Sequence, residues 1–242
     1  MAKTSLLFLP GLLLDARLYE AQIERLVDVA DIAVGDLDRG LGIAELASML
    51  LEEAPARFAL CGLSMGGYVA LEIMRQAPER ALRLALLDTQ ARADDAEITR
   101  RREAHIAAAE AGAFDSVLDQ LLPGWVHPAR ARDQRLMAKL REMALAAGPE
   151  SLVRQMRVIM SRPDSRASLA AISCPTLVLC GRQDAPTPVS VHEEMAAAIP
   201  DATLVVLPDC GHLSPLERPG EVSAQLRIWL AGHPADGSRR HP

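Results

Sequence analysis

An alternation of short apolar runs with segments of helical periodicity limits the possible folds of this chain more than any other feature. Runs rich in Leu, Val and Ala predict strands at residues 5–9, 32–35, 58–62, 83–88, 176–181 and 203–207. Apolar residues three and four apart predict helices at 16–27, 43–53, 65–77, 189–198 and 217–231. Buried parallel strands joined by crossover helices have this pattern. The sequence therefore predicts an α/β fold with a mostly parallel sheet of about six strands and helices on both faces.

The alternation stops between residues 91 and 168, where helical segments follow one another without a strand. We interpret residues 91–168 as a helical cap inserted after the fourth strand, over the carboxyl ends of the strands, where open α/β sheets bind ligands. The predicted core is then residues 1–90 and 169–231. The polar tail, residues 232–242, is expected to be flexible.

Composition and charge exclude several classes of protein. Half of the 242 residues are hydrophobic and a quarter are charged, and long uncharged apolar runs are absent, which argues against both disorder and a membrane span. The net charge of −6 argues against a nucleic-acid partner. The Arg100-Arg101-Arg102 run has Glu97 and Glu103 beside it, and this mixture predicts a solvated helix face.

The amino-terminal apolar run is too short for a signal peptide, so we expect a cytoplasmic protein. The cysteines, Cys61, Cys174, Cys180 and Cys210, form no CxxC pair, and three of them lie in or beside apolar runs. This pattern predicts reduced, packed thiols, with neither a metal site nor a cofactor.

The motif G-x-S-x-G occurs at residues 62–66, between a predicted strand and a predicted helix. A sharp turn there requires glycine at Gly62 and Gly66 and leaves the hydroxyl of Ser64 exposed above the sheet. Ser64 is thus the candidate nucleophile. The alternative is a serine that only caps the following helix.

A base and an acid follow in the order that this nucleophile needs. His212 lies on the loop after the last predicted strand and can accept and return a proton near neutral pH. Asp184, on the loop after the preceding strand, is the candidate to orient it, and Asp88, at the end of the fourth strand, is the alternative acid. Non-catalytic roles are expected for the other histidines, His105, His127, His192, His233 and His241.

The remaining candidate residues concern the oxyanion and the substrate. Backbone N–H groups of Leu12 and Met65 are expected to form an oxyanion hole, because they follow the first strand and the nucleophile respectively. The candidates for substrate contact are Leu13, Trp125, His127 and Met156. For the Leu and Met residues, simple core packing is the alternative.

Residues 10–12, 62–67, 180–184 and 211–212 together make the chain resemble the α/β-hydrolase superfamily. The resemblance extends over nearly the whole chain. It is strongest to the short carboxylesterases and enol-lactonases, a group that includes the methyl esterase acting on pimeloyl carrier protein. Two differences stand out: Pro10 replaces the histidine usual in the oxyanion loop, and the chain begins on the strand that would be the family's third.

The residues and the resemblance together predict a serine hydrolase that cleaves a carboxylic ester, lactone or thioester through an acyl-enzyme on Ser64. Its partner would be a small-molecule ester or acyl compound. A C–C bond hydrolase, perhydrolase or lyase with the same triad, or a non-catalytic ligand-binding protein, are the alternatives. The sequence makes no prediction of oligomeric state.

Overall fold

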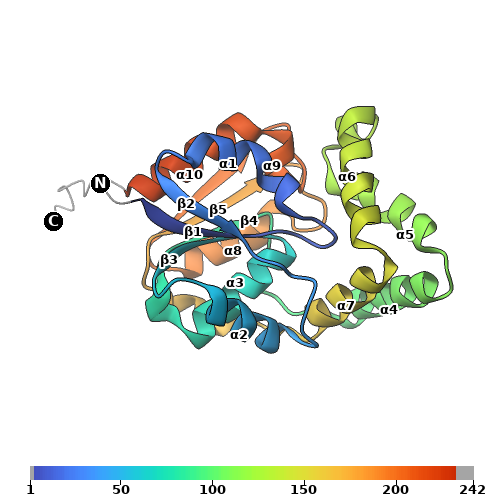
Figure 1. Cartoon of the computed structure of the whole chain (residues 1–242), viewed down its shortest axis with the longest axis horizontal. Coiled ribbons are helices and arrows are strands. Elements are labelled where there is room, and N and C mark those ends of the chain that lie inside the picture. The colour runs from blue at the N-terminus through green and yellow to red at the C-terminus, as the bar shows by residue number, and fades with distance from the viewer. Residues whose placement is uncertain (1–2, 233–242) are drawn as a thin grey trace.

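A computed structural model describes residues 3–232, which form one six-stranded parallel sheet (Figure 1). The strand order is β2-β1-β3-β4-β5-β6, and every neighbouring pair is parallel. The strands are β1 (Thr4–Leu9), β2 (Ala30–Val34), β3 (Phe58–Leu63), β4 (Ala81–Leu87), β5 (Thr176–Gly181) and β6 (Ala202–Leu207). All six predicted strands are present, with bounds shifted by two residues at most.

Helices cover both faces of the sheet. Figure 1 shows α1 (Glu20–Leu26) and α10 (Pro219–Ala231) on one face, and α2 (Ile43–Glu53) and α3 (Met65–Gln76) on the other. Another helix, α8 (Val189–Ala198), packs against β5 and β6. The predicted α/β architecture is confirmed. Within residues 3–232, no helix has both the length and the apolar character needed to cross a bilayer.

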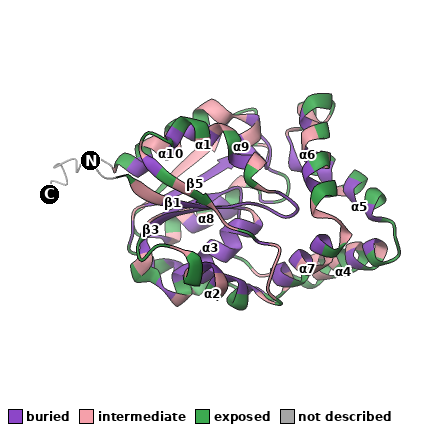
Figure 2. Cartoon of the chain, in the orientation of Figure 1, coloured by how far each residue is buried: buried purple, intermediate pink, exposed green. Residues whose placement is uncertain are grey.

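The burial of each strand follows from its place in the sheet. Every residue of β3 and β5, which have strands on both sides, is buried, whereas the edge strands β2 and β6 include exposed residues. Figure 2 shows the buried residues concentrated along the central strands and on α3. The continuous apolar runs in the sequence therefore belong to strands with helices on both sides.

The interruption after the fourth strand is a group of helices between β4 and β5. They are α4 (Ala96–Glu110), α5 (Phe114–Leu121), α6 (Gln134–Ala147) and α7 (Pro149–Met160), with the short 3-10 turns η3 (Leu122–Trp125) and η4 (Pro128–Arg130) between α5 and α6. Figure 1 shows α4 to α7 together beside the sheet. We call residues 91–168 the cap segment; its status as a separate domain stays a prediction.

Two predicted helices differ from those in the structure. Residues 16–27 begin as a 3-10 turn, η1 (Ala16–Tyr19), before α1. The predicted helix at 217–231 begins two residues later, as α10, because Pro219 fits the first turn of a helix; the short helix before it, α9 (Ser214–Glu217), was not predicted. Of the predicted tail, only residue 232 is among the described residues.

Candidate active site

Ser64 occupies the sharp turn between β3 and α3. Its backbone has φ 53° and ψ −113°, a combination that residues other than glycine rarely adopt. A Cβ atom at Gly62 would lie 2.2 Å from the carbonyl oxygen of Gly66, and one at Gly66 would lie 2.1 Å from that of Leu9. Both positions therefore require glycine. The Ser64 side chain makes no capping hydrogen bond to α3, which disfavours the helix-cap alternative.

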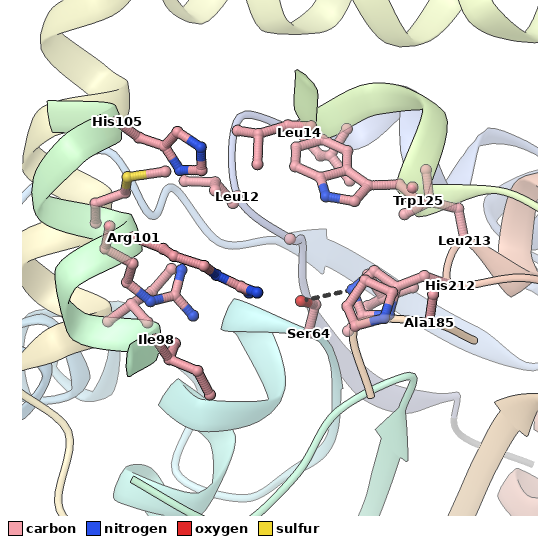
Figure 3. Close-up of a pocket in the computed structure, with 18 of the residues that line it drawn as sticks. Leu12, Leu14, Ser64, Ile98, Arg101, His105, Trp125, Ala185, His212 and Leu213 are labelled. Atoms are coloured by element: carbon pink, nitrogen blue, oxygen red, sulfur yellow. Dashed lines mark hydrogen bonds between the residues drawn. The ribbon is translucent and has the colours of Figure 1, made fainter. Parts of the chain in front are cut away.

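The Ser64 hydroxyl instead faces the ring of His212. The hydroxyl donates to Nε2 of His212 over 2.9 Å, drawn as a dashed line in Figure 3. His212 lies on the loop between β6 and α9, and only 4% of its surface is exposed. Residues from opposite halves of the chain thus meet above the carboxyl ends of β3 and β6.

The opposite nitrogen of the ring faces Asp184, from the loop after β5. Nδ1 of His212 donates to the Asp184 carboxylate, with distances of 2.9 and 3.0 Å to its two oxygens. Thr187 holds the carboxylate in place: its N–H donates to Oδ1 over 2.8 Å and its hydroxyl donates to Oδ2 over 2.7 Å. This role of Thr187 was not predicted from the sequence. A threonine three residues after a candidate acid is common in loops and does not by itself indicate a contact with that acid.

The electrostatics of this pair suit proton transfer. Burial lowers the pKa of His212, but the neighbouring Asp184 carboxylate opposes it, and the net effect raises the pKa above the ordinary 6.5. Burial raises the pKa of Asp184, but the His212 ring and the Thr187 donors outweigh it, so the pKa lies below the ordinary 3.8. Asp184 is therefore ionised at neutral pH and stabilises the protonated form of the ring.

Asp88, the alternative acid, has different partners. One carboxyl oxygen accepts the N–H of Gly181 over 3.1 Å, and the other accepts the N–H and the hydroxyl of Ser214 over 3.2 and 2.5 Å. Complete burial, followed by the Asp184 charge, raises its pKa well above the ordinary value. Asp88 joins the loops on which Asp184 and His212 lie, and Asp184 is the residue in contact with the ring.

The loop after β1 lies directly beside Ser64. A Cβ atom at Gly11 would lie 3.6 Å from Cβ of Ser64. Leu12 lines the same pocket as Ser64, and Met65 follows Ser64 in the chain; within residues 3–232, neither donates its backbone N–H to an acceptor. Their proposed role in an oxyanion hole stays a prediction.

Three contacts hold this loop, in which Pro10 stands where the families that the sequence resembles usually have a histidine. The Tyr19 hydroxyl donates to the carbonyl oxygen of Leu9 over 3.0 Å, and the Tyr19 ring stacks on Phe8. Farther along the loop, Leu13 donates its N–H to Oε1 of Gln155, from α7 of the cap segment, over 2.8 Å. The loop is therefore fixed from both sides.

A pocket of about 470 Å³ opens above Ser64, between the sheet and the cap segment. Of the residues predicted to contact substrate, Trp125 and Met156 line it. Leu13 and His127 are not among its lining residues: Leu13 is buried, with 1% of its surface exposed, and the His127 ring accepts the N–H of Ala129 at the start of η4. Contact of these four residues with a substrate stays a prediction.

The arginine run of α4 agrees only in part with its prediction. Arg100 and Arg101 are exposed, as a solvated face requires, and Arg102 is half-buried, but Arg101 and Arg102 also line the pocket. His105, expected to have a non-catalytic role, lines it too. The spacing of Ile98, Arg101 or Arg102, and His105 by three and four residues is the sequence signal for this shared face.

Two further predictions concern the cysteines and metal binding. All four cysteines are buried and free, as predicted, and burial raises the pKa of Cys180 to about 12. Residues 3–232 contain no group of three or more His, Cys, Asp or Glu side chains placed to hold a metal ion.

Comparison with known proteins agrees with this fold. The model of the alpha/beta hydrolase family matches residues 6–225. The chain therefore belongs to the alpha/beta hydrolase family. It is similar to a pimeloyl-[acyl-carrier protein] methyl ester esterase of Nitrosomonas europaea, with 30% identity over 75% of this chain and 72% of the relative.

Solved structures agree with the comparison of sequences. A thermophilic esterase from Thermogutta terrifontis, solved with malate bound, is 32% identical, with a TM-score of 0.87 over 95% of this chain and 90% of that one. The enol-lactonase from Burkholderia xenovorans LB400 is 24% identical, with a TM-score of 0.87 over 96% and 93% of the two chains, and shows the shared fold alone. The chain thus falls among the esterase-like members of its family.

Proposed function

We propose that this protein is a serine hydrolase that cleaves a carboxylic ester through an acyl-enzyme on Ser64. His212 takes the hydroxyl proton as Ser64 Oγ attacks the substrate carbonyl carbon, and Asp184 stabilises the resulting imidazolium. The N–H groups of Leu12 and Met65 bind the oxyanion. The imidazolium then protonates the leaving alcohol, and water, activated by the same ring, releases the acid.

A single observation carries this proposal. The hydrogen bonds from Ser64 to Nε2 of His212, at 2.9 Å, and from Nδ1 to Asp184, at 2.9 and 3.0 Å, form one continuous proton path. Its open end lies in the pocket, where a carbonyl carbon can approach the hydroxyl. The esterases among the relatives support ester hydrolysis as the reaction.

Ser64→Ala provides the first test. Against a panel of p-nitrophenyl esters of increasing acyl length, with methyl esters and lactones beside them, the variant should lose roughly four to six orders of magnitude in kcat. Ser48→Ala, a change at an exposed serine of α2, should keep the activity of the unchanged protein. Near-normal turnover by Ser64→Ala, with its fold intact by circular dichroism, contradicts the proposal.

A fluorophosphonate probe separates an enzyme from a ligand-binding protein on the same fold. Labelling of the unchanged protein, absent in Ser64→Ala, supports an activated nucleophile. The methyl ester named for the Nitrosomonas relative makes methyl esters the first substrates to test. C–C bond hydrolysis, perhydrolysis and lyase reactions can use the same triad. A rate of ester hydrolysis well above the rates of these three reactions favours the esterase.

A further inference from the structure

One face of α4 forms the wall of the pocket across from His212. Ile98, Arg101, Arg102 and His105, spaced by three and four residues, all line the pocket. Figure 3 shows Arg101 and His105 on the opposite side of Ser64 from His212. A substrate bound at Ser64 therefore lies between the imidazole and this face of α4.

This wall carries positive charge without matching negative charge. The pocket lining contains two arginines, Arg101 and Arg102, and among the described residues that form it there is no Asp or Glu. The carboxylate behind the wall is Asp94, which accepts from Nε of Arg102 and from Nη2 of Arg162, at 2.7 Å in each case. This carboxylate thus pairs with two guanidinium groups, those of Arg102 and Arg162.

The guanidinium group of Arg101 takes no part in this network of ion pairs. It forms no ion pair and no side-chain hydrogen bond with any of residues 3–232, although Glu97 and Glu103 are near it in sequence. Arg102 and Arg162, in contrast, are both bonded to Asp94. The planar fork of a guanidinium suits a carboxylate, which it can bind with two parallel hydrogen bonds.

His105 responds to this positive field. Burial lowers its pKa below the ordinary 6.5, and the charges of Arg101 and Arg102 lower it further. A neutral imidazole at this position can still donate one hydrogen bond to an anion. The charges of Arg101 and Arg102 therefore produce a positive potential inside the pocket, where His105 lies.

The remaining walls of the pocket are mainly apolar. Leucines surround Ser64 from the loops after β1 and β6, and Trp125 closes the pocket on the cap side (Figure 3). The apolar side chains there include Leu12, Leu14, Leu63, Trp125, Met156 and Leu213, and Tyr68, Gln90 and Gln120 are the polar members. A ligand that fits both walls has an apolar middle and an anionic end.

We propose that the substrate is an ester that also carries a free carboxylate, such as the half-ester of a dicarboxylic acid, and that Arg101 binds this carboxylate. The inference rests on the proposed function, since it places the ester at Ser64. It goes further in naming the charge of the substrate and the residue that selects it. Arg101 binds the substrate and takes no part in bond breaking.

Matched pairs of esters test this selection. Monomethyl esters of succinic to suberic acid are compared with methyl butanoate to methyl octanoate, which lack the second carboxylate. The best half-ester should exceed its neutral partner by about tenfold in kcat/KM, the lower end of what a hydrogen bond to a charged group provides, because Arg101 is exposed to solvent. The difference should be in KM, because the contact is the same in the ground and transition states.

Arg101→Gln and Arg100→Gln form a matched pair of variants on one helix. Arg101→Gln should bring the ratio of half-ester to neutral ester close to one. Arg100→Gln removes the same charge outside the pocket and should keep the ratio. An unchanged protein without preference for the half-ester, a preference that survives Arg101→Gln, or an equal loss in Arg100→Gln each overturns the inference.

A binding measurement distinguishes failure of this inference from failure of the proposed function. Calorimetry with Ser64→Ala and a half-ester should give binding about tenfold tighter than in Ser64→Ala/Arg101→Gln. Turnover of neutral esters that depends on Ser64, without charge preference, rejects the inference and keeps the function. Absence of turnover and labelling, with the binding difference present, rejects the function and keeps the anion site. Equal binding by the two variants rejects the anion site.

Discussion

The backbone N–H of His212 donates to the carbonyl oxygen of Trp125 over 3.1 Å, which joins the loop of the proposed base to the cap segment. Glu217 reinforces this junction. Its two carboxylate oxygens accept the N–H of Gly211 over 2.9 Å and the N–H of His127 over 2.8 Å. The position of the imidazole therefore depends on the segment that covers it.

Glu217→Ala should weaken both the fold and the reaction. It leaves two backbone N–H groups without an acceptor, which costs roughly 2–4 kcal/mol in the free energy of unfolding. Urea unfolding measures this loss, and kcat should fall because the His212 loop is less well placed. Glu221→Gln, which removes an exposed carboxylate from α10, is the control and should change neither quantity measurably. Full activity and stability of Glu217→Ala contradict the role of the junction.

Two variants distinguish the acids. Asp184→Asn should lower kcat by about 10⁴-fold, because an amide neither stabilises the imidazolium nor holds the required tautomer. Asp88→Asn should destabilise the loops around Gly181 and Ser214 but lower kcat far less, since Asp88 has no contact with the ring. Steady-state kinetics of both proteins, after circular dichroism has shown them folded, provide the comparison. A larger loss in Asp88→Asn reverses the assignment.

The pH profile should reflect the raised pKa of His212. The ring acts as a base only when neutral, and its pKa lies above the ordinary 6.5. The value of kcat/KM should therefore fall on the acid side with a midpoint above pH 6.5 and be highest in mildly alkaline solution. In Asp184→Asn, the carboxylate that raises the pKa is absent, so the midpoint of the residual activity should move to lower pH. An acid limb with its midpoint well below pH 6.5 in the unchanged protein is the contrary result.

His192 should make stability depend on pH. Burial lowers its pKa from 6.5 to about 4, and its Nε2 accepts the N–H of Thr89 over 3.0 Å, which requires an unprotonated nitrogen. As pH falls from 6.5 towards 4, the unfolded chain takes up a proton that the folded chain does not, so stability falls by about 3 kcal/mol. Urea midpoints across this range, compared with those of His192→Gln, isolate the effect. An identical pH slope in the variant argues against it.

The sequence was sufficient for the sheet and for the meeting of Ser64, Asp184 and His212, because the signals are local. Glycines at 62 and 66 require the sharp turn, and each of the other two residues follows an apolar strand. Parallel strands bring such loops to one edge of the sheet. The sequence favoured Asp184 and kept Asp88 as the alternative, since both follow neighbouring strands; the structure places Asp184 in contact with the ring and gives Asp88 other partners.

The cap side of the pocket was less predictable, since it depends on contacts between distant segments. The spacing of Ile98, Arg101 and His105 indicates that they share a helix face, but nothing near Arg101 in sequence indicates that this face lines the pocket above Ser64. The same holds for Leu13, whose N–H bonds to Gln155 from a helix far along the chain. Helical periodicity predicts that a face exists, but the fold determines what that face meets.

The backbone of Ser64 has a consequence for the balance between stability and reactivity. Glycine adopts φ 53° and ψ −113° without strain, whereas serine there costs roughly 1–3 kcal/mol. Ser64→Gly should thus yield an inert protein that melts at a higher temperature than the active one. Serine at position 64 thus supplies the reactive hydroxyl but lowers the stability of the folded protein. Random mutagenesis with selection for heat resistance alone should therefore favour the loss of this serine.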